Sequence, residues 1–82
     1  MNHLKLLRTM QQDSSIFLLY EELFPDRSGY SVAICGKNGQ FAFASDITNR
    51  RDAAERFFSL ICKGDLAPCH LYDVLEDMLP LS

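Results

Sequence analysis

The residues of this chain that could carry chemistry lie close together near its C-terminal end: Cys69, His70, Asp73 and Asp77. On a helix, His70, Asp73 and Asp77 are spaced three and four residues apart and therefore share one face. A histidine with two carboxylates could hold a divalent cation. With Cys69 as a thiol, this cluster defines one hypothesis, a metal-dependent or thiol-based enzyme.

The spacing within this cluster argues against such an enzyme. The sequence contains no Cys-x-x-Cys pair and no His-x-x-x-His pair, which are common ligand spacings. Cys69 and His70 are adjacent, so on a helix their side chains point about 100° apart and do not form a nucleophile and its base. Gly36 and Gly39 flank a hairpin turn and not a phosphate-binding loop. We therefore expect no catalytic residue, no cofactor and no bound metal, with His70 on the surface.

Composition and charge exclude several classes of partner. The 82 residues carry a net charge of −3, and an acidic protein does not attract a nucleic-acid backbone. The longest uninterrupted apolar run, residues 16–20, is far shorter than the ~20 residues that span a membrane or the ~7–15 of a secretory signal. Three cysteines are an odd set, typical of reduced intracellular thiols. We expect a cytoplasmic protein that binds neither nucleic acid nor membrane.

Acidic residues dominate the end of the chain. Residues 64–82 contain Asp65, Asp73, Glu76 and Asp77 but no lysine or arginine. Glutamate and aspartate near a helix C-terminus interact unfavourably with the helix dipole. A binding surface for a basic partner is one interpretation of this acidic stretch. Asp73, Glu76 and Asp77 are therefore the candidate partner-binding residues, and a solvated helix face is the simpler interpretation.

The elements that position these residues begin with a hairpin around Asn38-Gly39. Asn-Gly favours a two-residue type I′ turn. That turn would place Ile34 opposite Phe43 and would divide the hairpin into two faces. The predicted large face, which should meet the helices, holds Tyr30, Val32, Ile34, Phe41 and Phe43. The predicted small face holds Ser31, Ala33, Cys35, Ala42 and Ala44.

Upstream of this hairpin, residues 16–24 are predicted as a further strand, followed by the turn residues Pro25-Asp26-Arg27-Ser28-Gly29. Both sides of that strand are apolar, which is typical of a strand covered on both faces. A helix over residues 14–24 remains an alternative because its glutamates and leucines are good helix formers. Residues 3–11 fit either a strand or a short helix.

Two helices are predicted in the second half. The first begins with Asn49 as a cap, with Asp52 reaching back, and ends at Lys63 before Gly64. The second begins near Pro68 and ends at Pro80. Their apolar stripes are Ala53, Ala54, Phe57, Phe58 and Ile61 on the first, and Leu71, Val74, Leu75, Met78 and Leu79 on the second. The sequence therefore predicts one α+β domain over residues 1–82, a three-stranded antiparallel meander packed on one face by two C-terminal helices in β-β-β-α-α order.

The tail from Pro68 to Leu79 resembles a small uncharacterised family of clostridial and other Firmicutes proteins. Members of that family have a C-terminal helix of the form Pro-x-His-Leu-x-Asp-Val-x-Glu-Asp-x-Leu. Eight positions of this form match here, namely Pro68, His70, Leu71, Asp73, Val74, Glu76, Asp77 and Leu79. The resemblance covers residues 28–80 and implies a bacterial origin and a compact domain of unknown function. It implies no activity.

The surface left after the helices pack suggests the function. The small face, with Ala33, Cys35, Ala42 and Ala44, would remain uncovered and apolar, and such patches are uncommon on monomers. A twofold dimer through this face, or through the edge of the sheet, is the simplest cover, although the N-terminal segment could fold over the face instead. We expect a small, non-enzymatic protein-binding or regulatory module that self-associates, because a chain of this size leaves little room for an enzyme cleft.

Overall fold

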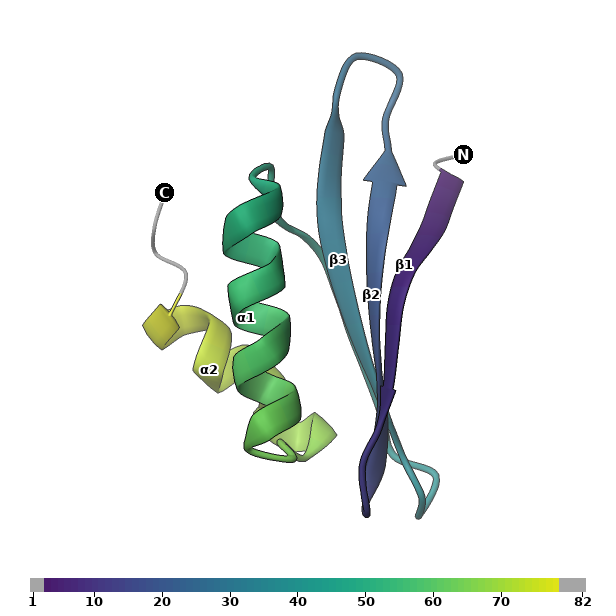
Figure 1. Cartoon of the computed structure of the whole chain (residues 1–82), viewed down its shortest axis with the longest axis vertical. Coiled ribbons are helices and arrows are strands. Elements are labelled where there is room, and N and C mark those ends of the chain that lie inside the picture. The colour runs from purple at the N-terminus through teal and green to yellow at the C-terminus, as the bar shows by residue number, and fades with distance from the viewer. Residues whose placement is uncertain (1–2, 79–82) are drawn as a thin grey trace.

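The computed structural model of the protein describes residues 3–78. Four strands come first and are followed by two helices (Figure 1). The elements are β1 (His3–Gln11), β2 (Ser15–Leu23), β3 (Ser28–Gly36), β4 (Phe41–Thr48), α1 (Arg51–Lys63), the 3-10 helix η1 (Pro68–His70) and α2 (Leu71–Met78). Neighbouring strands pair antiparallel in the order β1-β2-β3-β4. The predicted α+β class with two C-terminal helices is confirmed, but the sheet has four strands and not three.

The additional strand is β1, formed by the segment that fitted either a strand or a helix. It pairs with β2 along its whole length, with a bulge between Leu6 and Arg8. The bulge turns Leu7 toward the core, where it is partly buried. β2 is a strand with Phe17 and Leu19 fully buried, so the helical alternative for residues 14–24 is wrong.

The β3–β4 turn is longer than predicted. Gly36 N donates to Gln40 O at 2.8 Å, and Gly39 N donates to Gly36 O at 3.2 Å. The loop therefore has three residues, Lys37 to Gly39, and Gly39 adopts a φ of 90°. This is a type I turn followed by a left-handed glycine, which Asn-Gly fits as well as it fits the two-residue turn.

The extra loop residue shifts β4 by one position along β3. Phe41 lies opposite Cys35, and Ala42 lies opposite Ile34. Because side chains alternate along a strand, a shift of one residue exchanges the two faces of β4. Ala42 and Ala44 are buried in the core, at 8% and 5% exposed, so the predicted small face is wrong. Phe41 and Phe43, predicted to meet the helices, point to the opposite side of the sheet.

The helix α1 packs its apolar stripe on the sheet, as predicted. Ala53, Ala54, Phe57, Phe58 and Ile61 are all buried. The predicted cap is wrong, because the N-cap of α1 is Arg50 and not Asn49. The arginine side chain has no acceptor for the first N–H groups of the helix.

An ion pair and a hydroxyl hydrogen bond lie at the start of α1 instead of a side-chain cap. Arg50 Nη2 donates to Asp52 Oδ2 at 2.9 Å. Thr48 Oγ1 accepts the backbone N–H of Arg50 at 3.2 Å. The arginine therefore binds the carboxylate that was expected to complete a capping box with Asn49.

α1 ends at Lys63, as predicted, in a Schellman motif whose left-handed residue lies one position after Gly64. Leu66 N donates to Ile61 O, and Asp65 N donates to Cys62 O, both at 3.1 Å. Gly64 remains helical with a φ of −86°, and the left-handed residue is Asp65, with a φ of 47°. Ser14 Oγ donates to Asp65 Oδ2 at 2.7 Å, which ties this corner to the β1–β2 loop.

The last helical segment begins at Pro68, as predicted, with a 3-10 turn that leads into α2. Leu71 is fully buried, and Val74 and Leu75 pack against the core as partly buried side chains. The side chain of Met78, and the predicted end of the helix at Leu79 and Pro80, lie outside the described residues.

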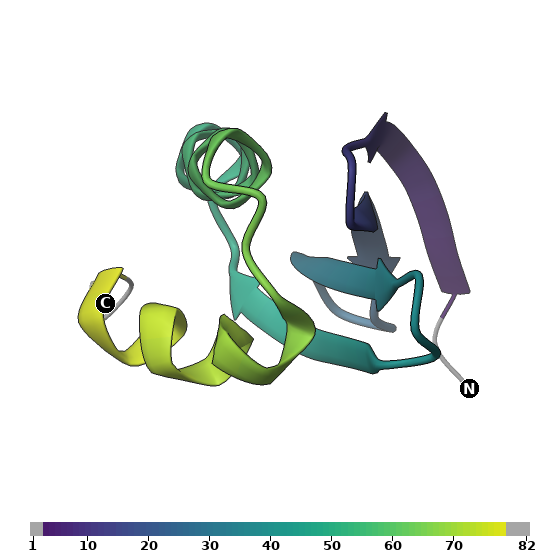
Figure 2. The same cartoon turned by 90° about the horizontal axis from the view of Figure 1, so that it is seen from below.

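Both helices lie on the same side of the sheet (Figure 2). α1 packs against β2, β3 and β4, and α2 packs against β4. The core between these two layers holds Phe17, Leu19, Val32 and Ile34 from the sheet and Phe57, Phe58, Ile61 and Leu71 from the helices. The other side of the sheet is not covered by any element within residues 3–78.

Candidate protein-binding surface

The uncovered side of the sheet is called here the outer face. Register places directly paired residues of antiparallel strands on the same side. The outer face therefore consists of Leu4, Leu6, Thr9, Gln11, Ile16, Leu18, Tyr20, Glu22, Ser31, Ala33, Cys35, Phe41, Phe43 and Ser45. These side chains come from all four strands, so the face spans the whole sheet.

Large apolar side chains on this face are open to solvent. Phe41 is 64% exposed, Leu6 52%, Leu4 48% and Ile16 38%. An aromatic side chain has about 150–250 Å² of surface, so Phe41 alone exposes about 100–160 Å². Contiguous apolar patches of several hundred Å² mark interaction sites on soluble proteins.

The centre of the outer face is built around a small residue. Ala33, on the inner strand β3, is 2% exposed and pairs with Leu18 on one side and Phe43 on the other. The rings of Tyr20 and Phe43 meet edge to face across it, with centroids 6.4 Å apart. This packing fixes the aromatic side chains in place before any partner arrives.

Charge is nearly absent from the outer face. Glu22 is the only charged residue among those named above, and it is buried at 7% exposure. Next to it, the Asp46 carboxylate lies over Gly29, the partner of Glu22, and binds Arg27 at 2.8 Å. The basic residues of β1 point to the other side, where Arg8 Nε donates to Glu55 Oε1 of α1 at 2.6 Å. Apart from this end, the outer face is therefore uncharged within the described residues, in a chain of which 23% is charged.

Glu22 ends the apolar part of the face with a hydrogen-bonded cluster. Its Oε1 accepts Ser31 Oγ at 2.7 Å and Ser45 Oγ at 2.6 Å. Ser31 Oγ in turn accepts the backbone N–H of Asp46 at 3.1 Å. One sign of this cluster is present in the sequence, a glutamate and a serine at positions where the alternation of each strand favours an apolar residue. Their pairing is visible only in the fold.

Of the four residues predicted to mediate self-association, two lie on the outer face. Ala33 lies at its centre, and Cys35 is partly exposed opposite Phe41. Ala42 and Ala44 are core residues and cannot line it. Phe41 and Phe43 take their place, which makes the face larger and more apolar than the sequence indicated.

The candidate metal ligands do not converge. Asp73 and Asp77 lie on the exposed side of α2, and His70 is exposed at the end of η1. Within residues 3–78, no three His, Cys, Asp or Glu side chains are grouped closely enough to hold a metal ion. The absence of enzymatic activity and of cofactors stays a prediction.

The three cysteines are free thiols in different surroundings. Cys69 is exposed, Cys35 is partly exposed on the outer face, and Cys62 is buried on the core side of α1. Burial raises the pKa of the Cys62 thiol to about 11, because a thiolate there would lose its hydration. Cys62 therefore stays protonated near neutral pH and is a poor nucleophile.

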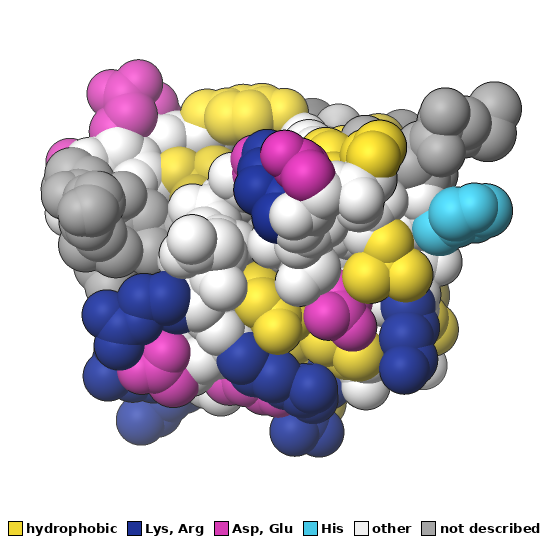
Figure 3. Space-filling view, turned by 90° about the horizontal axis from the view of Figure 1, so that it is seen from above, with side chains coloured by type: hydrophobic (Ala, Val, Ile, Leu, Met, Phe, Trp, Pro, Cys, Tyr) yellow, Lys and Arg dark blue, Asp and Glu magenta, His cyan; other side chains and the backbone are white. Residues whose placement is uncertain are grey.

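Ion pairs concentrate around α1. Glu55 accepts Arg8 and, at 3.3 Å, Arg51, and the hydrogen bond from Arg8 lowers the pKa of the Glu55 carboxyl. Lys and Arg side chains gather with acidic ones on the side where α1 lies (Figure 3). The three candidate partner-binding residues, Asp73, Glu76 and Asp77, are exposed on the other helix.

Comparison with known proteins adds no relative. No family model matches the chain, and neither a curated protein nor a solved structure matches it. The resemblance of the tail to the Firmicutes family therefore stays a prediction. No helix within the described residues is long and apolar enough to cross a membrane.

Proposed function

We propose that this protein is a small, non-enzymatic protein-binding module that works as a twofold dimer through its outer face. The observation that supports this proposal is an uncovered sheet face with exposed Phe41, Leu6 and Leu4, on which the exposed charge is confined to the Arg27–Asp46 pair at one end. Free thiols fit a reducing compartment, so we propose that the dimer acts in the cytoplasm.

A second copy of the chain suits this face because the apolar part of the face carries no charge. A charged partner surface would leave its own ions desolvated and unpaired against the apolar side chains, which is costly. The apolar part of an identical face brings no charge. In a twofold arrangement the same patch meets itself, so one self-complementary surface is sufficient.

The experiment that tests the dimer substitutes one exposed leucine on each side of the molecule. Leu6, on the outer face, is 52% exposed, and Leu60, on α1, is 49% exposed. Both Leu6→Glu and Leu60→Glu should fold, because neither side chain is buried in the monomer. Only Leu6→Glu would place a carboxylate in the interface, where it would weaken association by about 100-fold or more.

Sedimentation at micromolar concentration measures the outcome. We expect wild type and Leu60→Glu at twice the 9.3 kDa mass of the chain, and Leu6→Glu at the monomer mass. A wild-type protein that sediments as a monomer, or a Leu6→Glu variant that remains a dimer, would contradict the proposal.

A further inference from the structure

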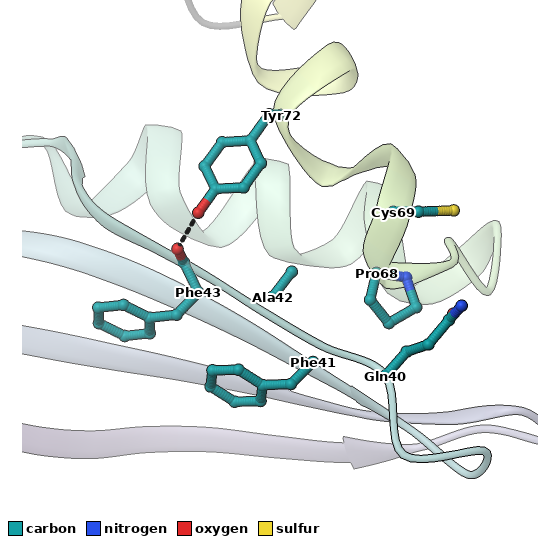
Figure 4. Close-up of a pocket in the computed structure, with 7 residues that line it drawn as sticks. All are labelled: Gln40, Phe41, Ala42, Phe43, Pro68, Cys69 and Tyr72. Atoms are coloured by element: carbon teal, nitrogen blue, oxygen red, sulfur yellow. Dashed lines mark hydrogen bonds between the residues drawn. The ribbon is translucent and has the colours of Figure 1, made fainter.

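A groove runs between the free edge of β4 and the segment that leads into α2. It has a volume of about 620 Å³ and is lined by residues 40–43 of the β4 edge together with Pro68, Cys69 and Tyr72. Figure 4 shows Tyr72 reaching from α2 across the groove to β4, while the rings of Phe41 and Phe43 point away from it. The strand side of the groove is therefore formed largely by backbone.

The backbone of β4 presents hydrogen-bonding groups to this groove. Tyr72 Oη donates to Phe43 O, which shows that the carbonyl of Phe43 points away from β3. In an antiparallel pair, the N–H and C=O of one residue point the same way, and the direction repeats every second residue. The N–H of Phe43 and both backbone groups of Phe41 therefore face the groove, and β4 has no second neighbouring strand within the described residues.

The two edges of the sheet differ in their protection. β1 carries Lys5 and Arg8 and has a bulge between Leu6 and Arg8, all of which discourage pairing with another strand. Residues 41–45 of β4 carry no charge and no proline, and the register shift of this strand follows Ala44, close to Asp46 with its φ of 54°. β4 is the edge that an added strand could extend.

The helix beside this edge is acidic. Glu76 lies one turn after Tyr72 and therefore on the same side of α2 as the groove. Asp73 and Asp77 flank that side, and all three carboxylates are exposed. No lysine or arginine occurs in η1 or α2 to balance them.

We propose that the β4 groove binds an extended basic peptide segment of a partner protein by strand addition. The backbone of the segment pairs with Phe41 and Phe43, and its N–H displaces the Tyr72 hydroxyl from the Phe43 carbonyl. Alternate side chains of the segment reach opposite sides of the extended sheet. Side chains on the α2 side are basic and meet Asp73, Glu76 and Asp77, whereas those on the other side are apolar and continue the row of Phe41 and Phe43.

A second copy of this chain is a poorer occupant of the groove. Pairing β4 with its own copy would bring two α2 helices together, with the three carboxylates of each facing those of the other. Like charges brought together in this way oppose association. The groove and the outer face therefore select different partners, and this proposal does not depend on the dimer.

The first test removes one backbone donor. Phe41→Pro and Phe41→Ala both lose the ring, but only proline removes the N–H that faces the groove. Proline is tolerated where the N–H of an edge strand points away from the sheet. The probe is a fluorescein-labelled Lys-Val-Lys-Val-Lys-Val peptide, with binding followed by fluorescence anisotropy.

We expect the peptide to bind Phe41→Pro about tenfold more weakly than Phe41→Ala, as the loss of one hydrogen bond predicts. Equal affinities would overturn strand addition. In wild-type protein, hydrogen exchange at the Phe41 and Phe43 amides should slow when the peptide is added, which tests the proposal even if Phe41→Pro does not fold. Unchanged exchange at both amides with the peptide bound would also overturn it.

The second test concerns charge. Glu76→Lys and Asp26→Lys change the net charge equally, but Asp26 lies in the exposed β2–β3 loop and not on α2. We expect Glu76→Lys to weaken binding several-fold, Asp26→Lys to have little effect, and a Glu-Val-Glu-Val-Glu-Val peptide not to bind. An equal effect of both variants, or binding of the acidic peptide, would contradict the proposed chemistry. Sedimentation of the same variants reports the dimer separately.

Discussion

At the scale of single residues, charge is distributed unevenly between the two sides of the sheet. Glu55 lies on the helix side and is held by two arginines from different elements, Arg8 of β1 and Arg51 of α1. Glu22, on the outer face, is buried and bound by two serine hydroxyls. Each carboxylate is thus satisfied within the monomer, and the exposed charge on the outer face is limited to the Arg27–Asp46 pair beside Gly29.

The Glu55 pairs should make stability depend on pH. The folded protein has a lowered pKa at Glu55, chiefly through the hydrogen bond from Arg8, relative to the ordinary value of 4.5. A lowered pKa stabilises the fold above the unfolded-state pKa, and this stabilisation is lost as the pH falls through the folded-state pKa.

Urea denaturation of wild type and Glu55→Gln at a series of pH values checks this dependence. Wild type should be the more stable protein at pH 7, and the difference should shrink below about pH 4.5. Glu76→Gln, an exposed glutamate on α2, is the control and should show a smaller dependence. A difference between wild type and Glu55→Gln that stays constant across the pH range would contradict the role of these pairs.

At the scale of elements, the β3–β4 loop decides which residues form the core. Its three-residue length places Ala42 and Ala44 against α1 and α2 and turns Phe41 and Phe43 outward. Small residues on the helix side of β4 leave room for the bulky Phe57, Phe58 and Leu71. The loop therefore sets both the packing of the helices and the character of the outer face.

Gly39 is the residue on which this loop depends. Its φ is 90°, and a Cβ added there would meet no atom within 4 Å, so only backbone strain opposes a side chain. We expect Gly39→Val to lower the free energy of unfolding by about 1–2 kcal/mol, the cost of a left-handed conformation. Gly39→Asn should cost less, because asparagine tolerates this region. Urea denaturation measures both, and a loss below about 0.5 kcal/mol for valine would contradict the loop conformation.

At the scale of the whole molecule, the helices and the proposed partner copy cover opposite sides of one sheet. The three thiols lie in different parts of this arrangement. Cys62 is on the core side of α1, Cys35 is on the outer face, and Cys69 lines the β4 groove. Their accessibility therefore reports the arrangement of the whole assembly in one experiment.

Alkylation with iodoacetamide, followed by mass spectrometry, should rank the thiols. At pH 8 we expect Cys69 to react fastest and Cys62 to remain unmodified until the protein unfolds, because it is buried and its pKa is about 11. Cys35 should be protected in wild type and in Leu60→Glu but should react in the monomeric Leu6→Glu variant. Equal reactivity of Cys35 in all three proteins would contradict an interface on the outer face.

Much of the fold could be predicted from the sequence. The order of strands before helices, the buried stripe of α1 and the start of the last helix at Pro68 follow from local periodicity and from proline, which act over a few residues. These features are confirmed because an apolar helix face is buried against the sheet whichever residues of the sheet it meets.

The pairing of distant residues was decided only by the tertiary structure. Asn38-Gly39 is compatible with loops of two or three residues, and the packing of Ala42 and Ala44 under the helices is satisfied only by the longer one. Likewise, residues 3–11 form the strand β1 because they pair with β2. Their own sequence fits a strand and a helix equally well. The apolar outer face and the β4 edge without a neighbouring strand result from these long-range pairings, which a local sequence pattern does not contain.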